Sequence, residues 1–449
     1  MVLTSRNITV TKNVLLAILK RQSGKVEQLL HFFRPPFFYF ISYKKTFMRT
    51  LLYLLLVLGL QTVVAQDHLN LDQLASFETF LKEEISNGQI AGVEAMVYHK
   101  NKIAWRTNLG YSDLNNRTPL TENSIYFLQS MTKPIMSVAI MQLVEQGHLS
   151  LDEKASAYLP GLKNLTVIDD LSTGVNGPTS KKERSITIQH LLTHTAGLSH
   201  GLEENVFDKE LFKLMYNDLF DPAVYEKLED RVAVLLQVPL IGQPGEQWYY
   251  SAATDVLALI VQEVSGQPIN TYLKEHIFRP LEMNETGYNL TEDSAKRLMK
   301  VHLKNEDDIL VTSPVQVPTQ ANTVYGGTHG LFSSINDYLQ FCKMILNEGE
   351  LNGKQVLQPA TVALMQENHV GKLLGASRGF GLGFGVLVDT EKDPSPASNG
   401  QIYWGGFFKT HFFIDPAEDL IAIFMTQKMP NTNEYVIALN RHVYGALQN

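Results

Sequence analysis

The stretch that decides the fold is residues 130–146, which read SMTKPIMSVAIMQLVEQ. Apolar residues fall on nearly every side of a helix drawn over this stretch, which is typical of a buried helix. Pro134 is tolerated only in the first turn of a helix, and Gly147 is a natural stop. The pattern therefore predicts a buried helix that begins close to Ser130 and ends before Gly147.

Ser130 and Lys133 lie three residues apart at the predicted N-terminus of this helix, so their side chains share one face. Free N–H groups and the positive end of the helix dipole favour negative charge there. A desolvated lysine can lose its proton near neutral pH and activate a serine as a nucleophile. The same spacing occurs at Ser42 and Lys45 without a helix start, so the alternative of a capping serine beside a solvated lysine stays open.

The composition is that of an ordinary globular protein with ample length for a large core: 449 residues, 44% of them hydrophobic and 19% charged. The formal net charge is −8, but residues 1–65 hold nine Lys/Arg and a single acidic residue. Those residues contribute +8, so the rest of the chain carries −16. Such an acidic body gives no reason to expect a nucleic-acid partner.

Residues 48–65 have the pattern of a secretory signal peptide, with a basic start, an apolar run over 51–60 and small residues ending at Ala65. The run is shorter than the roughly 20 apolar residues of a membrane span. We therefore predict an exported protein, periplasmic or secreted, with no stable membrane span after signal removal; an uncleaved anchor is the alternative. Residues 1–47 do not fit a signal peptide and are interpreted as a non-native upstream extension, with Met48 as the true start.

Cys342 is the only cysteine, which excludes an intrachain disulfide and a cysteine metal cluster. Its apolar surroundings favour a buried, inert thiol. His190, His194 and His200 lack the spacing and the third ligand of a zinc hydrolase site. We predict no metal ion and no cofactor.

Strand patterns occur at both ends of the chain and helical patterns lie between them. The predicted strands cover 93–98, 103–107, 379–388, 403–408, 410–414 and 420–426, and the flanking amphipathic helices cover 71–85 and 435–447. The economical architecture is an α/β (α+β) fold, in which both chain ends build one antiparallel sheet flanked by helices. Residues 66–449 would form one domain, with an α/β part at 66–149 and 321–449 and an inserted, mainly helical part at 150–320.

Several long motifs occur in the order found in the serine β-lactamase and penicillin-binding-protein-like hydrolases, and the chain resembles that family over roughly residues 71–447. The motifs are SMTKP at 130–134, ITIQHLLTHTAGL at 186–198, PGEQWYYS at 244–251 and GGTHGLFSS at 326–334. Several signatures in order are far more specific than one motif. The resemblance implies a β-lactamase/DD-peptidase-like fold and makes Ser130 the nucleophile.

The second catalytic motif of this family is Tyr-x-Asn, which here resembles Tyr250-Ser251-Ala252. Tyr249 is the rival tyrosine, but Tyr250 fits the family spacing better. The resemblance implies that Tyr250 shares the serine's proton with Lys133. Ala252 replaces an asparagine that offers its amide to substrates, a polar contact worth roughly 1 kcal/mol. This departure weakens the β-lactam and peptide interpretations.

The third motif has two possible registers, Lys409-Thr410-His411 and Trp404-Gly405-Gly406. We favour the second, because glycine lets a substrate approach the backbone closely. The backbone N–H groups of Ser130 and Phe407 would then form the oxyanion hole. This register resembles the family VIII carboxylesterases, and Lys409 becomes a solvated strand residue.

The resulting prediction is an exported serine hydrolase that forms an acyl-enzyme. Its small-molecule acyl substrate is predicted to be a small carboxylic ester. Ser130, Lys133 and Tyr250 are the catalytic residues, with the choice of general base left open, and Trp404, Gly405 and Gly406 bind substrate. Residues 172–184 and 203–230 are expected to shape the pocket. A β-lactamase or D-amino-acid peptidase is the alternative, and a non-catalytic penicillin- or peptidoglycan-recognising sensor is the alternative of another class.

Overall fold

The computed structural model of the chain describes residues 69–216, 225–314 and 317–447. Residues 69–449 form one compact unit. The predicted signal peptide at 48–65 and the predicted upstream extension at 1–47 lie outside the described residues. Among the residues that are described, no helix is both long and apolar enough to cross a membrane.

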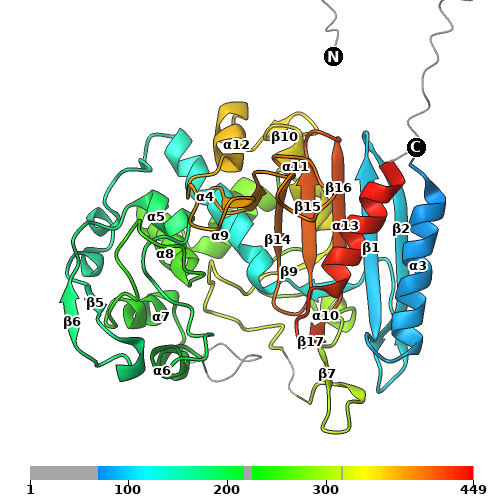
Figure 1. Cartoon of the computed structure of the whole chain (residues 1–449), viewed down its shortest axis with the longest axis horizontal. Helices are drawn as coiled ribbons and strands as arrows, with labels where there is room; N and C mark the ends of the chain where they lie inside the picture. The colour runs from blue at the N-terminus through cyan, green and yellow to red at the C-terminus, as the bar shows by residue number, and fades with distance from the viewer. Residues whose placement is uncertain (1–68, 217–224, 315–316, 448–449) are drawn as a thin grey trace, which may run out of the picture. The chain divides into compact units, whose positions relative to one another are not determined.

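The central element is an eight-stranded antiparallel sheet built from strands of the early and late parts of the described chain (Figure 1). Its order is β12 (Arg378–Phe380), β13 (Gly385–Leu387), β14 (Ile402–Gly405), β15 (His411–Asp415), β16 (Leu420–Met425), β1 (Gly92–His99), β2 (Lys102–Asp113) and β3 (Thr118–Pro119). The N-terminal strand β1 pairs with the late strand β16, with Met96 opposite Ile423. The predicted fold class, with one sheet built from both ends of the chain, is confirmed.

Two terminal helices, α3 (Leu71–Ser86) and α13 (Glu434–Leu447), lie side by side against the sheet (Figure 1). Val93, Ala95 and Val97 of β1 share a core with these helices, whereas Met96 and Tyr98 belong to the core on the other face. Successive side chains of a strand point to opposite faces, so a strand covered on both sides is apolar throughout. This double burial explains why β1 has no exposed face.

The other face of the sheet carries α4 (Thr132–Glu145) and α11 (Ile335–Leu346), and beyond them the middle of the chain. That middle part contains α5 (Ile188–Leu192), α6 (Val206–Met215), α7 (Leu228–Leu235), α8 (Ala253–Ser265), α9 (Ile269–Leu273) and α10 (Glu292–Lys296). It also holds four short strands, β5 (Thr166–Ile168), β6 (Thr179–Lys181), β7 (His302–Lys304) and β8 (Leu310–Thr312). The remaining elements are β4 (Ile125–Phe127), β9 (Phe332–Ser334), β10 (Glu350–Leu351), β11 (Lys354–Gln355), α12 (Pro359–Gln366) and β17 (Lys428–Met429).

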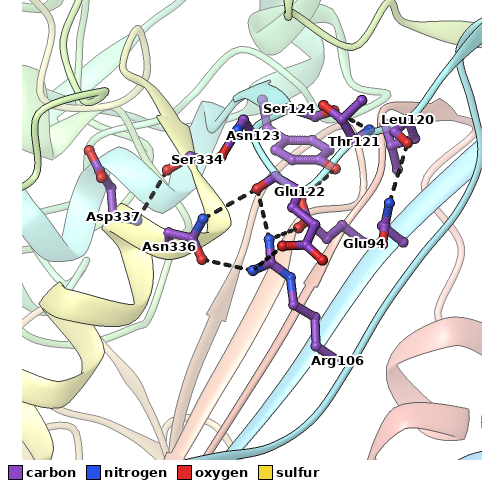
Figure 2. Close-up of polar contacts among 12 residues, drawn as sticks. Glu94, Arg106, Leu120, Thr121, Glu122, Asn123, Ser124, Ser334, Asn336 and Asp337 are labelled. Atoms are coloured by element: carbon purple, nitrogen blue, oxygen red, sulfur yellow. Dashed lines mark hydrogen bonds and ion pairs between the residues drawn. The ribbon is translucent and has the colours of Figure 1, made fainter.

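A buried ion pair on β1 and β2 ties the sheet to the segments around it (Figure 2). Glu94 is fully buried and accepts hydrogen bonds from Arg106 and from the Tyr126 hydroxyl, the latter at 3.2 Å. Arg106 also donates to the carbonyl of Glu122 at 2.7 Å and to the side chain of Asn336 on α11 at 3.2 Å. The network therefore joins the sheet to β4 through Glu94 and to α11 through Arg106.

Burial raises the pKa of Glu94 from 4.5 to about 7, although Arg106 and Tyr126 oppose the shift. Between those two pH values the folded protein binds the proton that the unfolded chain releases, so stability should fall as pH rises from about 4.5 to 7. The fall attributable to Glu94 is about 3 kcal/mol. Urea unfolding at several pH values should show that Glu94→Gln removes this slope, whereas Glu83→Gln, at an exposed position of α3, keeps it. An unchanged slope in Glu94→Gln would assign the pH dependence to other groups.

Candidate active site

Ser130 lies in a short 3-10 turn, Gln129–Met131, that leads into α4 at Thr132, so the α-helix begins two residues later than expected. Gln129 has φ 50°, a left-handed conformation that is strained for a residue other than glycine. The turn is fixed by contacts on either side: the Tyr338 hydroxyl donates to the Met131 carbonyl at 3.0 Å, and Thr132 accepts from the Leu331 N–H at 3.3 Å. These contacts hold Ser130 in a fixed position at the N-terminus of α4.

Lys133 is almost completely buried, with 1% of its surface exposed. Its Nζ donates to Ser130 Oγ at 3.2 Å and to the Thr328 carbonyl at 3.0 Å. Burial lowers the pKa of Lys133 from 10.5 to about 7, Asp255 opposes this shift and Arg231 adds to it. A lysine with this pKa is partly neutral at physiological pH and can accept a proton.

A second layer of residues places the Thr328 carbonyl. The N–H of Thr328 donates to Asp255 Oδ1 at 2.8 Å, and Asp255 Oδ2 lies 2.8 Å from Arg231 in a buried ion pair. The two glycines before Thr328 let the chain pass this closely. A Cβ at Gly326 would lie 1.9 Å from Arg231 Nη2, and one at Gly327 would lie 2.0 Å from the Thr254 carbonyl. The glycine-rich motif therefore positions the lysine through backbone contacts.

Tyr250, and not Tyr249, reaches the nucleophile. The hydroxyl of Tyr250 donates to Ser130 Oγ at 2.5 Å, whereas that of Tyr249 donates to Gln247 at 2.6 Å. Burial raises the pKa of Tyr250, so the phenol keeps its proton at neutral pH. Lys133 Nζ also lies 4.6 Å from the centre of the Tyr250 ring. The structure thus brings the three predicted catalytic side chains together.

Two buried histidines, His194 of the motif at 186–198 and His200 just after that motif, hold the tyrosine ring. His194 contacts Tyr250 edge-on at 5.2 Å and shares a hydrogen bond of 2.9 Å with Ser251, and His200 packs on Tyr250 at 5.2 Å. Burial lowers the pKa of both imidazoles well below 6.5, so both are neutral. Within the described part of the chain, no group of three or more His, Cys, Asp or Glu side chains is arranged to hold a metal ion.

The third predicted motif lies beside the nucleophile turn, at the end of β14. β13 pairs with β14 only as far as Tyr403, so β13 does not cover the strand edge from Trp404 onward. Trp404 through Phe407 line the same cavity as Ser130. A Cβ at Gly406 would lie 2.3 Å from the Leu128 carbonyl and 2.2 Å from the Thr410 side chain. Gly406 is therefore required for the close approach of this strand to the nucleophile turn.

Lys409 is not the solvated strand residue that the sequence predicts. The strand ends at Gly405, which pairs with His411, and residues 406–410 form the turn between β14 and β15. Lys409 sits in that turn with φ 74°, and only 3% of its surface is exposed. Its Nζ donates to the Asn431 side chain at 3.0 Å.

One cavity of about 940 Å³ contains the site. The middle of the chain lines it with aromatic and apolar side chains, among them Leu202, Phe212, Tyr216 and Trp248. The segment before β14, the segment before α13 and α13 itself add polar side chains, among them Ser395, Gln401, Asn431 and Asn440. Ser130 opens onto this cavity, so the nucleophile can reach a substrate held there.

The sequence predicts that residues 172–184 and 203–230 shape the pocket, and the first of these two expectations is wrong. None of residues 172–184 lines the cavity, because part of that segment is folded into the β5–β6 hairpin. From 203–230, the described residues Phe212 and Tyr216 do line it. Ala252 is fully buried at the start of α8 and contributes nothing to the cavity wall, so no amide is offered at that position.

Sequence reasoning missed Asp255, Arg231 and His329. Asp255 and Arg231 form the buried pair behind Lys133, and His329 lines the cavity. Asp255 could have been noticed as a charged residue inside the apolar run of α8, because an unpaired charge is costly in such a place. Arg231 and His329 have no comparable signal, since their positions depend on how α7 and the glycine-rich segment pack.

The fold and the Ser–Lys–Tyr arrangement define a β-lactamase-like protein, and the sequence profile of the Beta-lactamase family matches residues 76–445. The chain therefore belongs to the Beta-lactamase family. It is 27% identical over 376 residues to Esterase EstB of Burkholderia gladioli, with 78% of this chain and 88% of that protein covered. It is 31% identical over 368 residues to an uncharacterised protein of Mycobacterium tuberculosis, with 78% of this chain and 89% of that protein covered.

Among solved structures, the chain is similar to EstCE1, described as a hydrolase with promiscuous acyltransferase activity. The TM-score is 0.73 at 25% sequence identity, with 83% of this chain and 99% of that chain covered. The predicted family resemblance is confirmed, and a hydrolase with esterase and acyltransferase relatives is the class that these comparisons define.

Proposed function

We propose that this protein is a serine hydrolase that cleaves small carboxylic esters through an acyl-enzyme. The observation that carries the proposal is the convergence of two proton-transfer groups on one hydroxyl: Lys133 Nζ at 3.2 Å and the Tyr250 hydroxyl at 2.5 Å from Ser130 Oγ. A nucleophile and base within hydrogen-bond reach are the mark of covalent catalysis. The esterase relatives and the absence of an amide at Ala252 favour esters over lactams and peptides.

The opposite pKa shifts of Lys133 and Tyr250 suggest how they divide the work. The neutral amine of Lys133 takes the proton of Ser130 as the oxygen attacks the ester carbonyl. The phenol of Tyr250, which keeps its proton, donates it to the departing alkoxide. The N–H groups of Ser130 and Phe407 stabilise the tetrahedral oxyanion. In the second half of the reaction the Tyr250 phenolate takes a proton from the attacking water, and the Lys133 ammonium returns its proton to Ser130 Oγ as the acid leaves.

The proposal is tested by labelling with a fluorophosphonate probe and by parallel rate measurements. The wild-type protein should be labelled and Ser130→Ala should not. Initial rates on p-nitrophenyl butyrate, nitrocefin and a D-Ala-D-Ala peptide should be highest on the ester. A higher rate on nitrocefin or on the peptide would establish a β-lactamase or D-amino-acid peptidase instead. A stable penicillin adduct without turnover of any substrate would favour the non-catalytic sensor.

Export is a separate part of the proposal, and it is supported by the signal-peptide pattern of residues 48–65. Edman sequencing of the protein purified from its native cells should give an N-terminus directly after Ala65. Recovery of a peptide from residues 1–47 would refute both the export signal at this place and the start at Met48.

A further inference from the structure

Lys409 is a buried cation that the proposed mechanism does not use. It lines the cavity that contains Ser130, and it lies in the turn after the strand that carries Trp404 and Gly405. Among the described residues, the only other Lys or Arg that lines this cavity is Arg378, which is paired with Asp393 at 2.7 Å. Lys409 has no carboxylate of the described residues within 4 Å. Its ammonium has three donors, and the described partner is the Asn431 side chain.

The charged groups around Lys409 do not neutralise it. Glu434 acts on Lys409 only at longer range, since it is paired with Lys428 at 3.5 Å and bonded by Thr432. Lys428 adds positive charge, and burial keeps His411 neutral by lowering its pKa to about 3. Burial lowers the pKa of Lys409 to about 8, so the ammonium still predominates at pH 7. An unpaired buried charge is costly unless a ligand supplies its counter-charge.

The backbone adds a second cost at the same residue. Lys409 has φ 74°, in a region that glycine occupies freely and that other residues occupy under strain. A lysine is thus held where glycine would be more stable and where its charge is poorly compensated. Strain and perturbed ionisation at one cavity residue together point to a binding role.

We propose that Lys409, oriented by Asn431, forms a subsite that binds a carboxylate group carried by the substrate. This inference rests on the proposed ester hydrolysis and names its substrate class: an ester with one free carboxylate. Asn431 also donates to the Gly406 carbonyl at 3.3 Å, so the subsite is tied to the turn that contains Phe407. The Lys409 ammonium is bonded to the neutral Asn431 amide, and the nearby Lys428 is already paired with Glu434. The subsite therefore offers one positive charge, which favours a carboxylate over a phosphate dianion.

The test compares two pairs of esters, and in each pair a free carboxylate is replaced by its neutral methyl ester. The first pair is 4-acetoxybenzoate and its methyl ester, with the carboxylate on the leaving group. The second is 4-nitrophenyl hydrogen terephthalate and its methyl ester, with the carboxylate on the acyl group. Wild-type kcat/KM should be about tenfold higher for the anionic member of at least one pair, the effect of one charge-assisted hydrogen bond. Equal rates within both pairs would overturn the proposal.

Lys409→Gly is the decisive variant, because glycine suits the turn and the protein should fold with an unchanged or higher Tm. It should lose the preference for the anion through a higher KM, with the neutral ester hydrolysed as before. Lys409→Arg should keep part of the preference. Lys392→Met removes the same charge from an exposed side chain and should change nothing. An equal loss on both members of a pair in Lys409→Gly would mean a structural role and would overturn the subsite.

A binding measurement can test the carboxylate subsite independently of ester hydrolysis. Titration calorimetry of 4-acetoxybenzoate on Ser130→Ala, with and without Lys409→Gly, requires no turnover. Weaker binding in the double variant would support the subsite even if the wild-type protein hydrolysed no ester. Equal binding would overturn the subsite and leave the proposed function standing on its rate measurements.

Discussion

Lys133→Met is expected to lower kcat/KM for p-nitrophenyl butyrate by about 10³-fold, the usual contribution of a positioned general base. Methionine preserves the volume of the buried side chain and removes the amine that donates to Ser130 Oγ at 3.2 Å. The fold should survive, because a buried ionisable group is replaced by an apolar one. Circular dichroism and thermal melting check this point alongside the rates.

The pH profile makes the same prediction sharper. The pKa of Lys133 is about 7 and the base form is the neutral amine, so wild-type kcat/KM should rise with pH and level off above about 7. Asp255 raises this pKa, so Asp255→Asn should move the rising limb to lower pH. The prediction fails if the rising limb of the pH profile stays in place in Asp255→Asn or is unchanged in Lys133→Met. Either result would show that a group other than Lys133 titrates.

The parts of the site that the sequence predicts are those that depend on residue type over a short span. The apolar run of residues 130–146 predicts α4, and the offset of its start arises from the left-handed Gln129, which no pattern marks. The sequence predicts the strand around Trp404 but not its end at Gly405, because that end is set by pairing with His411 on β15. Lys409 is wrongly predicted as a solvated strand residue for the same reason, because it lies in the turn that follows Gly405.

Long-range pairs are the part that the sequence does not predict. Arg231 and Asp255 lie on different helices. Glu94 reaches Arg106 and Tyr126, and Arg106 reaches Asn336, only because the sheet, β4 and α11 pack together. Each of these contacts depends on how distant segments pack together, and residue propensity and hydrophobic periodicity do not predict that packing. The buried charges themselves were visible in the sequence, and their partners were not.

Tyr250→Phe is expected to lower kcat by about 10²- to 10⁴-fold with little change in KM, because the ring stays and the proton donor goes. The phenyl ring would keep its packing against His194 and His200, so the protein should remain folded. Tyr249→Phe is the matched control, since the Tyr249 hydroxyl bonds to Gln247 instead of the nucleophile. Normal turnover in Tyr250→Phe would remove the phenol from the mechanism.

The leaving group decides which role Tyr250 plays. A p-nitrophenolate leaves without a proton, whereas an alkoxide needs one, so a general acid matters far more for an ethyl ester than for a p-nitrophenyl ester of the same acid. If Tyr250 protonates the leaving group, the loss in Tyr250→Phe should be much greater on the ethyl ester. If Tyr250 instead removes the proton of Ser130, both esters should lose the same factor, and the raised pKa of this phenol would then have to fall when substrate binds.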